Sequence, residues 1–217
     1  MNRQEELIAA IKSGESQKVA RLLDDDRSLV DARAGEVSAT LLALYCGKRE
    51  IAELFVERGK QLSFPEACAL GDLDGVQRML AADSSLLDRR SDDGYPPLGL
   101  AIFFRQPEVA RYLVSQGADV NAAATNRQRV APVHAAATVS DSESMRLLLE
   151  RGADPNARQE MDYAPMHSAA AHGDVEMGRL LLQYGGDPRA RGADGKTPAD
   201  VARERGHAAF VTWVESA

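Results

Sequence analysis

Apolar residues recur along this chain at intervals of three and four, the spacing of one face of an α-helix. Each stretch is short and ends at a glycine or at a cluster of Asp, Asn and Pro, residue types that interrupt helices and form turns. Alanine and leucine dominate the apolar set, which suits closely packed short helices. Clear stripes are formed by Leu7, Ile8 and Ile11, by Val19, Leu22 and Leu23, by Val109, Tyr112 and Leu113, and by Met177, Leu180 and Leu181. The pattern predicts many short amphipathic helices.

A turn residue recurs between the two helices of each predicted pair and serves as a ruler. It falls at Gly14, Gly47, Gly71, Arg105, Ser140, Gly173 and Gly206, with successive gaps of 33, 24, 34, 35, 33 and 33 residues. A period of this size indicates a repeat architecture in which each unit packs only on its neighbours. The ruler predicts seven units.

Two central segments nearly repeat each other. G-A-D-V-N at 117–121 precedes A-P-V-H-A-A at 131–136, and G-A-D-P-N at 152–156 precedes A-P-M-H-S-A at 164–169. The period and the A-P-x-H phrase resemble the ankyrin repeat. The resemblance implies an all-α solenoid of about seven helix-turn-helix units, including N- and C-terminal caps, with short hairpin connections. We expect one domain over 1–217, with units near 2–33, 34–60, 62–91, 92–123, 127–157, 160–191 and 193–217.

The caps predict a complete small protein, with Trp213 closing the end of the core. Two departures interrupt the regular pattern. Only a few residues separate Gly59 from the helix expected near Phe64, so we expect the hairpin between units two and three to be absent or stunted. Arg105 replaces the usual glycine directly after Phe103 and Phe104, so the geometry of that turn is expected to differ.

Composition excludes several classes of protein. The net charge is -7 and no basic run occurs, which argues against a nucleic-acid-binding surface. The N-terminus lacks the features of a signal peptide, and the apolar run 98–104 is too short to cross a membrane. Two cysteines are too few for a disulfide framework and favour a reduced compartment. We expect a soluble, cytoplasmic protein.

The sequence predicts no catalytic residue, no metal site and no cofactor. His134 and His167 occupy matched positions, but no Cys or third His lies at metal-ligand spacing beside them. The resemblance implies that they tie neighbouring hairpins and helices together. Phosphate-loop, nucleophile-elbow and zinc-protease motifs are absent from the sequence. We therefore expect a protein that is not an enzyme.

The resemblance implies that residues just before each turn, together with hairpin-tip residues, face a concave groove. Apolar and aromatic side chains gather at these positions in the middle units, and exposed apolar rows suggest a contact surface. Whether Phe103 and Phe104 face the groove or pack as core is left open by the sequence. The predicted partner-binding residues are Tyr45, Leu70, Tyr95, Phe103, Phe104, Val130, Val139, Met161, Tyr163 and His172.

We therefore predict a scaffold that binds a protein partner in its groove through an apolar-aromatic patch. One alternative is a self-associating domain, since an apolar groove can pair as a weak two-fold homodimer. The other is a small-ligand or enzymatic site near the shortened 59–64 connection, where Cys46 and histidines could gather.

Overall fold

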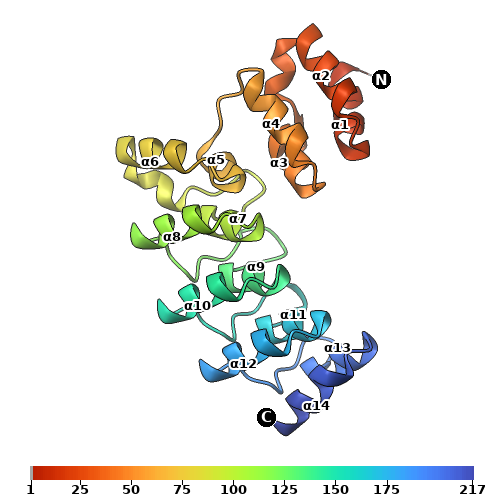
Figure 1. Ribbon diagram of the computed structural model, residues 1–217, viewed down its shortest axis with the longest axis vertical. Helices are drawn as coiled ribbons and strands as arrows, with labels where there is room; N and C mark the ends of the chain where they lie inside the picture. The colour runs from red at the N-terminus through yellow and green to blue at the C-terminus, as the bar shows by residue number, and fades with distance from the viewer. Residues whose placement is uncertain (1) are drawn as a thin grey trace.

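The computed structural model describes residues 2–217 and is built almost wholly of short helices (Figure 1). The helices are α1 (Arg3–Ser13), α2 (Ser16–Asp25), α3 (Ala39–Tyr45), α4 (Arg49–Glu57), α5 (Phe64–Leu70), α6 (Leu73–Ala82), α7 (Pro97–Phe103), α8 (Pro107–Ser115), α9 (Pro132–Thr138), α10 (Ser142–Glu150), α11 (Pro165–His172), α12 (Val175–Gln183), α13 (Pro198–Glu204) and α14 (Ala208–Ser216). Three 3₁₀ segments, η1 (Arg27–Asp31), η2 (Ser84–Asp88) and η3 (Glu160–Asp162), and two short antiparallel strands, β1 (Arg33–Ala34) and β2 (Val37–Ser38), complete the described chain.

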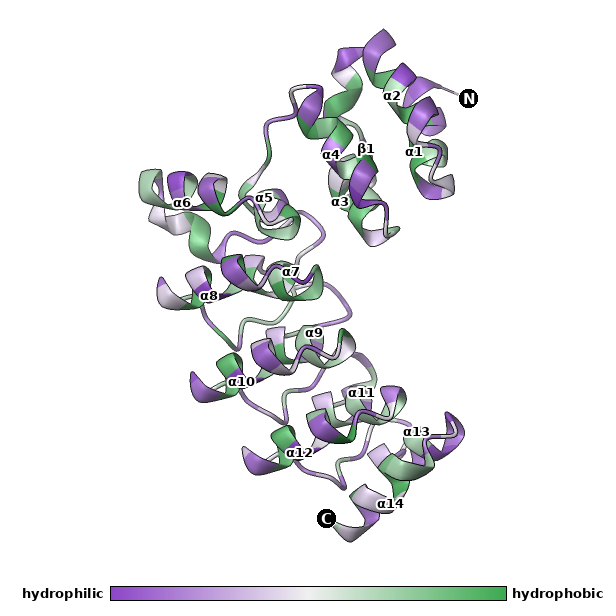
Figure 2. Cartoon of the chain, in the orientation of Figure 1, coloured by the Kyte–Doolittle hydropathy of each residue, from purple (hydrophilic) through white to green (hydrophobic). Residues whose placement is uncertain are grey.

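The helices form two layers of a solenoid, as predicted. The first helix of each pair packs on the first helix of the next pair, and the second helices form a parallel layer beside them. Apolar residues line the faces where neighbouring pairs meet, whereas the connections are mostly polar (Figure 2). One core cluster runs from α5 to α14, and a second runs from α1 to α5 and reaches Leu100 of α7.

The ruler residues all adopt the left-handed backbone conformation. Five of them are glycines with φ between 67° and 81°, which glycine adopts without steric cost. Arg105 and Ser140 adopt φ of 56° and 50° despite their side chains. The turn at Arg105 therefore keeps the geometry of its neighbours, and the expectation that it would differ is wrong. Pairing and packing of the flanking helices hold these two residues in a conformation that costs about 1 kcal/mol or more.

Short loops, here called fingers, connect the later pairs and project from the first-helix layer. They span 91–95, 124–130, 159–163 and 192–196, and each is closed by a backbone hydrogen bond between its two ends. Neighbouring fingers are also linked. Thr125 N donates to Gly94 O over 3.0 Å, and equivalent bonds of 2.8 Å join Glu160 N to Gln128 O and Ala193 N to Met161 O.

The finger expected between the second and third pairs is missing. Residues 58–63 run directly from α4 to α5, and α4 stands apart from α6 at this point, so that the first four helices are offset from the column formed by the rest (Figure 1). The first connection, the β1–β2 hairpin, consequently has no adjacent finger. Instead Arg33 of this hairpin forms a 2.8 Å ion pair with Asp92, at the start of the finger 91–95.

Candidate functional site

A pocket of about 350 Å³ lies between the fingers and the C-terminal ends of the first helices. Its lining comes from three different pairs. Tyr45 belongs to α3, Tyr95 and Phe103 belong to the fourth pair and its finger, and Val130 belongs to the next finger. Four of the predicted binding residues thus meet in one cavity. We call it the aromatic pocket, defined by Tyr45, Tyr95, Gly99, Leu100, Phe103, Gln128, Val130, Ala135 and Thr138.

Tyr45 reaches this pocket across the third pair. Its ring lies 6.3 Å from that of Tyr95 and 5.4 Å from that of Phe104, both tilted, and Phe103 meets Phe104 edge-to-face at 5.1 Å. Such aromatic pairs contribute roughly 0.5–1.5 kcal/mol each beyond the area they bury. Tyr45 therefore contacts aromatic residues two pairs further along the array.

The sequence left open whether Phe103 and Phe104 face the groove or pack in the core, and the structure places one residue in each position. Phe103 is 38% exposed and lines the pocket, as does Tyr45 at 36%. Phe104 is half-buried and packs against the N-terminal core cluster, where it supports the Tyr45 ring from behind. Phe103 therefore presents an exposed aromatic surface at the pocket, and Phe104 lies behind the pocket wall against the core.

Hydrogen bonds fix the two tyrosines. The Tyr45 hydroxyl donates to Asp93 Oδ2 over 2.9 Å, and the Tyr95 hydroxyl donates to Gln128 Oε1. Asn126 Nδ2 donates to the Asp93 carbonyl over 2.8 Å, which ties the two fingers together below the pocket. Burial and the adjacent Asp93 carboxylate raise the pKa of Tyr45 well above its usual value, and burial raises that of Tyr95. Both hydroxyls therefore remain protonated donors.

The other predicted residues lie outside the aromatic pocket. Leu70 is only 6% exposed and packs in the N-terminal core cluster, so its prediction as a groove residue is wrong: all of α5 is covered by its neighbours. Tyr163 stacks on His167 at 4.6 Å and donates to Asp194 over 2.9 Å, which makes it a link between fingers. Val139 is half-buried, while Met161 and His172 are exposed further along the array.

Several lining residues were not predicted as binding residues. Gly99, Ala135 and Thr138 are small, and their size leaves the pocket its depth between the larger aromatic walls. Gln128 closes one side by accepting from Tyr95. Alanine and glycine in a helical stripe look like ordinary close-packing residues, so the sequence carried no signal for a cavity there.

The two matched histidines are used by the scaffold. His134 Nδ1 accepts from Ala131 N over 3.2 Å and its Nε2 donates to Ala157 O over 3.0 Å. His167 repeats the arrangement with Ala164 N and Lys196 O. Burial lowers the pKa of His134 to about 4 and also lowers that of His167. Both rings are neutral and tie a helix start to the following connection, as the resemblance implied.

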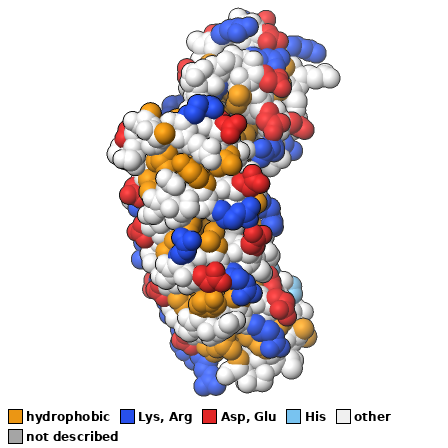
Figure 3. All heavy atoms as spheres, turned by 60° about the vertical axis from the view of Figure 1, so that its left-hand side comes forward, with side chains coloured by type: hydrophobic (Ala, Val, Ile, Leu, Met, Phe, Trp, Pro, Cys, Tyr) orange, Lys and Arg blue, Asp and Glu red, His pale blue; other side chains and the backbone are white. Residues whose placement is uncertain are grey.

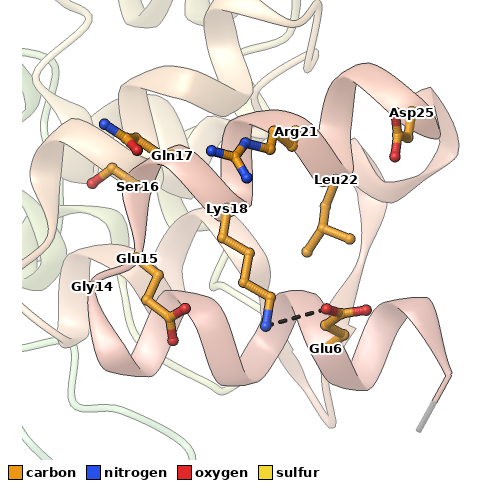
Figure 4. Close-up of a pocket in the computed structure, with 9 residues that line it drawn as sticks. All are labelled: Glu6, Gly14, Glu15, Ser16, Gln17, Lys18, Arg21, Leu22 and Asp25. Atoms are coloured by element: carbon orange, nitrogen blue, oxygen red, sulfur yellow. Dashed lines mark ion pairs between the residues drawn. The ribbon is translucent and has the colours of Figure 1, made fainter.

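The surface of α1 and α2 offers little organised chemistry. A wide depression on α1 and α2 is lined mostly by polar side chains, together with Leu22 (Figure 4). The Lys18 side chain forms a 3.2 Å ion pair with Glu6 in it. Acidic and basic groups are interspersed over the face in Figure 3. Within residues 2–217, no cluster of three His, Cys, Asp or Glu residues could hold a metal ion. In the same range, every helix is too short or too polar to cross a bilayer.

Comparisons with known proteins agree with this architecture. A family model described as "Ankyrin repeats (3 copies)" matches residues 64–159 and 133–214. Protein PhlB of Serratia liquefaciens is 30% identical over 134 residues, which cover 61% of this chain and 57% of that protein. The E3 ubiquitin-protein ligase KEG of Arabidopsis thaliana is 31% identical over 91 residues, 42% of this chain and 6% of the ligase. The similarity thus spans little more than half of the first relative and a small part of the second.

Proposed function

Because this chain belongs to the ankyrin-repeat family, whose members are generally protein-interaction modules, we propose that it is a scaffold that binds a protein partner through the aromatic pocket. The observation that carries the proposal is the pocket itself, with the exposed rings of Tyr45 and Phe103 on its walls. Aromatic side chains around a desolvated pocket dominate the energy of many protein interfaces. The pocket's volume suits one or two apolar side chains of a partner.

The rigidity of the walls supports this assignment. Tyr45 and Tyr95 are each held by a hydrogen bond to a finger, so their rings need not be ordered on binding. Fixing a rotamer-rich side chain at an interface costs about 0.5–1.5 kcal/mol, and a preorganised wall avoids that cost. A non-enzymatic role is supported by the engagement of His134 and His167 in the scaffold.

Two further parts of the proposal concern the cellular compartment and the class of partner. A cytoplasmic site of action is supported by the free thiols Cys46 and Cys68. A partner other than nucleic acid is supported by the net charge of -7.

The test compares affinity capture by the wild-type chain with capture by Phe103→Ser and by Val56→Ser. Val56 is a matched control, because it is an exposed apolar residue (41%) on α4 and does not line the pocket. We expect at least one protein to be retained by the wild type and by Val56→Ser and lost by Phe103→Ser. With that protein purified, removal of the Phe103 ring should weaken binding by about 10-fold or more. Retention of every captured protein by a folded Phe103→Ser variant would disprove the proposal.

Self-association is separated from partner binding by light scattering over a range of concentrations. The proposal expects a mass that does not change with concentration. A dimer abolished by Phe103→Ser would instead assign the pocket to pairing between two copies of the chain.

A further inference from the structure

The hydrogen-bonded series of fingers is interrupted where one finger is missing. In three fingers, the residue after the one that closes the finger donates its N–H to the preceding finger: Thr125, Glu160 and Ala193. Asp92 occupies the same position, directly after the closing donor Ser91. Its N–H has no hydrogen-bond partner within residues 2–217, because no finger precedes it. The backbone edge of the finger series is therefore unpaired on this side, where the Arg33–Asp92 ion pair joins it to the β1–β2 hairpin.

A cavity of about 390 Å³ lies at this opening, and we call it the finger gap. It is bounded by the β1–β2 hairpin, the start of α5, and the segment 89–92. Phe64, Leu86 and Met79 supply apolar surface, and Ser63 and Ser91 supply hydroxyls. The cavity shares none of its lining residues with the aromatic pocket.

Two side chains that line the finger gap each contain a polar atom, one an acceptor and one a donor, that forms no hydrogen bond within residues 2–217. Glu66 is 2% exposed, and its Oε2 accepts from Ser63 N over 2.7 Å. Its other oxygen, Oε1, has no hydrogen-bond partner in the described chain, and the nearest cation, Lys60 Nζ, lies 4.0 Å away. The Nε of Arg90 is buried and equally unpartnered, although Nη2 of the same side chain donates to Ala123 O over 3.2 Å. An unmet acceptor and an unmet donor match the N–H and C=O groups of a polypeptide backbone.

The charged side chains that line the finger gap indicate the charge of the polypeptide that would bind there. Arg89 and Arg90 both line the gap, and neither forms an ion pair with a carboxylate anywhere in residues 2–217. The other cations of the lining are already engaged, Arg33 with Asp92 and Lys60 with Asp31. The lining also contains three carboxylates: Asp92 pairs with Arg33, Glu66 lies 4.0 Å from Lys60, and Glu36 forms no ion pair with any described residue. The two guanidinium groups without a carboxylate partner outnumber this one free carboxylate, which favours an acidic occupant.

We propose that the finger gap binds an extended, acidic segment of a partner polypeptide, which lies in the place of the missing finger. A backbone carbonyl of the segment accepts from Asp92 N. Arg90 Nε and Glu66 Oε1 are buried, so the two side chains turn toward the gap to meet a further carbonyl and an N–H of the segment. Its carboxylates pair with the guanidinium groups of Arg89 and Arg90. The segment continues the finger series in trans, by the same backbone hydrogen bonding that joins the fingers of the chain itself.

The test uses a phage-displayed library of random linear peptides, selected on the full chain, followed by anisotropy titration of the selected peptides. We expect selection of peptides rich in Asp and Glu. Their affinity should fall by about 10-fold or more in the double variant Arg89→Ser, Arg90→Ser, because charge-assisted hydrogen bonds are lost. Glu66→Gln, which keeps an oxygen for the Ser63 cap, should also weaken binding. Circular dichroism and the thermal midpoint confirm that each variant is folded.

Two control variants test whether the selected peptides bind at the finger gap. Arg146→Ser, Arg189→Ser removes the same charge from exposed positions outside the gap, and Phe103→Ser alters the aromatic pocket. Both should leave peptide affinity unchanged. The proposal is overturned if no acidic peptides are selected, if the Arg146, Arg189 pair has the same effect as Arg89, Arg90, or if binding depends on Phe103. Retention of every captured protein by Phe103→Ser, together with intact binding of the acidic peptides at the finger gap, would reject only the aromatic pocket.

Discussion

His134 illustrates how a single residue stabilises a repeat junction. Its imidazole is fully buried and bridges Ala131 N, at the start of α9, to Ala157 O, in the connection that leads to the next pair. Nδ1 can accept only when it carries no proton, so this bridge requires the neutral ring. Burial enforces the same state by lowering the pKa of His134 to about 4.

The free energy of unfolding should consequently fall as the pH drops below 6.5. The unfolded chain takes up a proton near pH 6.5 and the folded chain does so only near 4, so the stabilisation is complete above 6.5 and is lost below it. For His134 alone, the loss between pH 7.5 and 5.5 is about 1.4 kcal/mol. Urea titrations of the wild type and of His134→Gln measure it, with His172→Gln, at an exposed position, as control. An unaltered pH dependence in His134→Gln would contradict this role.

At the scale of elements, α5 differs from the other first helices because all seven of its residues are buried. A complete capping box at Ser63 and Glu66 starts it, and Gly71 ends it with φ of 81°. With no finger above it, α5 is covered by α3 on one side and α7 on the other. Its Cys68 is fully buried, and burial raises the pKa of that thiol well above its usual value.

Cys68 should therefore react with thiol reagents only when α5 opens. Titration of the native protein with a thiol-specific chromogenic reagent is expected to modify Cys46, which is half-buried, and to leave Cys68 protected. Denaturant should expose the second thiol. In Cys46→Ser, the native protein should release almost no signal, and rapid modification of that variant would show that α5 is not closed in solution.

At the scale of the whole molecule, the junction between α4 and α5 is the weakest step of the array. Neighbouring pairs elsewhere are joined by helix packing in both layers, and from the third pair onward also by linked fingers. Here the finger is absent and α4 stands apart from α6. The core is divided into two clusters that meet at α5, and the N-terminal one reaches across α5 only to Leu100 of α7. Stability of a solenoid is the sum of its units and their interfaces, so a weak interface allows parts to unfold separately.

Phe55→Ala should accordingly unfold α1–α4 before the remainder. Phe55 is fully buried in α4, and its truncation is expected to cost about 3–5 kcal/mol. Hydrogen exchange followed by mass spectrometry should show lost protection in residues 3–57 with protection retained beyond 97. Phe210→Ala, at the opposite end of the array, is the matched control and should leave α1–α4 protected. Equal loss of protection along the chain would show that the array unfolds as one unit.

The sequence by itself determined the repeat, the helix pairs and the turn positions, because each depends on local chemistry. The A-P-x-H phrase places a helix start and a buried histidine, and the seven ruler positions all have positive φ even where Arg105 and Ser140 replace glycine. The short connection at 59–64 predicted a missing finger directly.

Only the tertiary structure decided how the units on either side of the missing finger are placed relative to each other. The approach of Tyr45 to the fourth pair and the separate roles of Phe103 and Phe104 depend on contacts between units that are not adjacent in the sequence. A repeat pattern specifies each unit and its regular neighbours. Where the regular neighbour is absent, the relative placement of the flanking units is set by side-chain packing and ion pairing across the gap, which the local pattern does not encode.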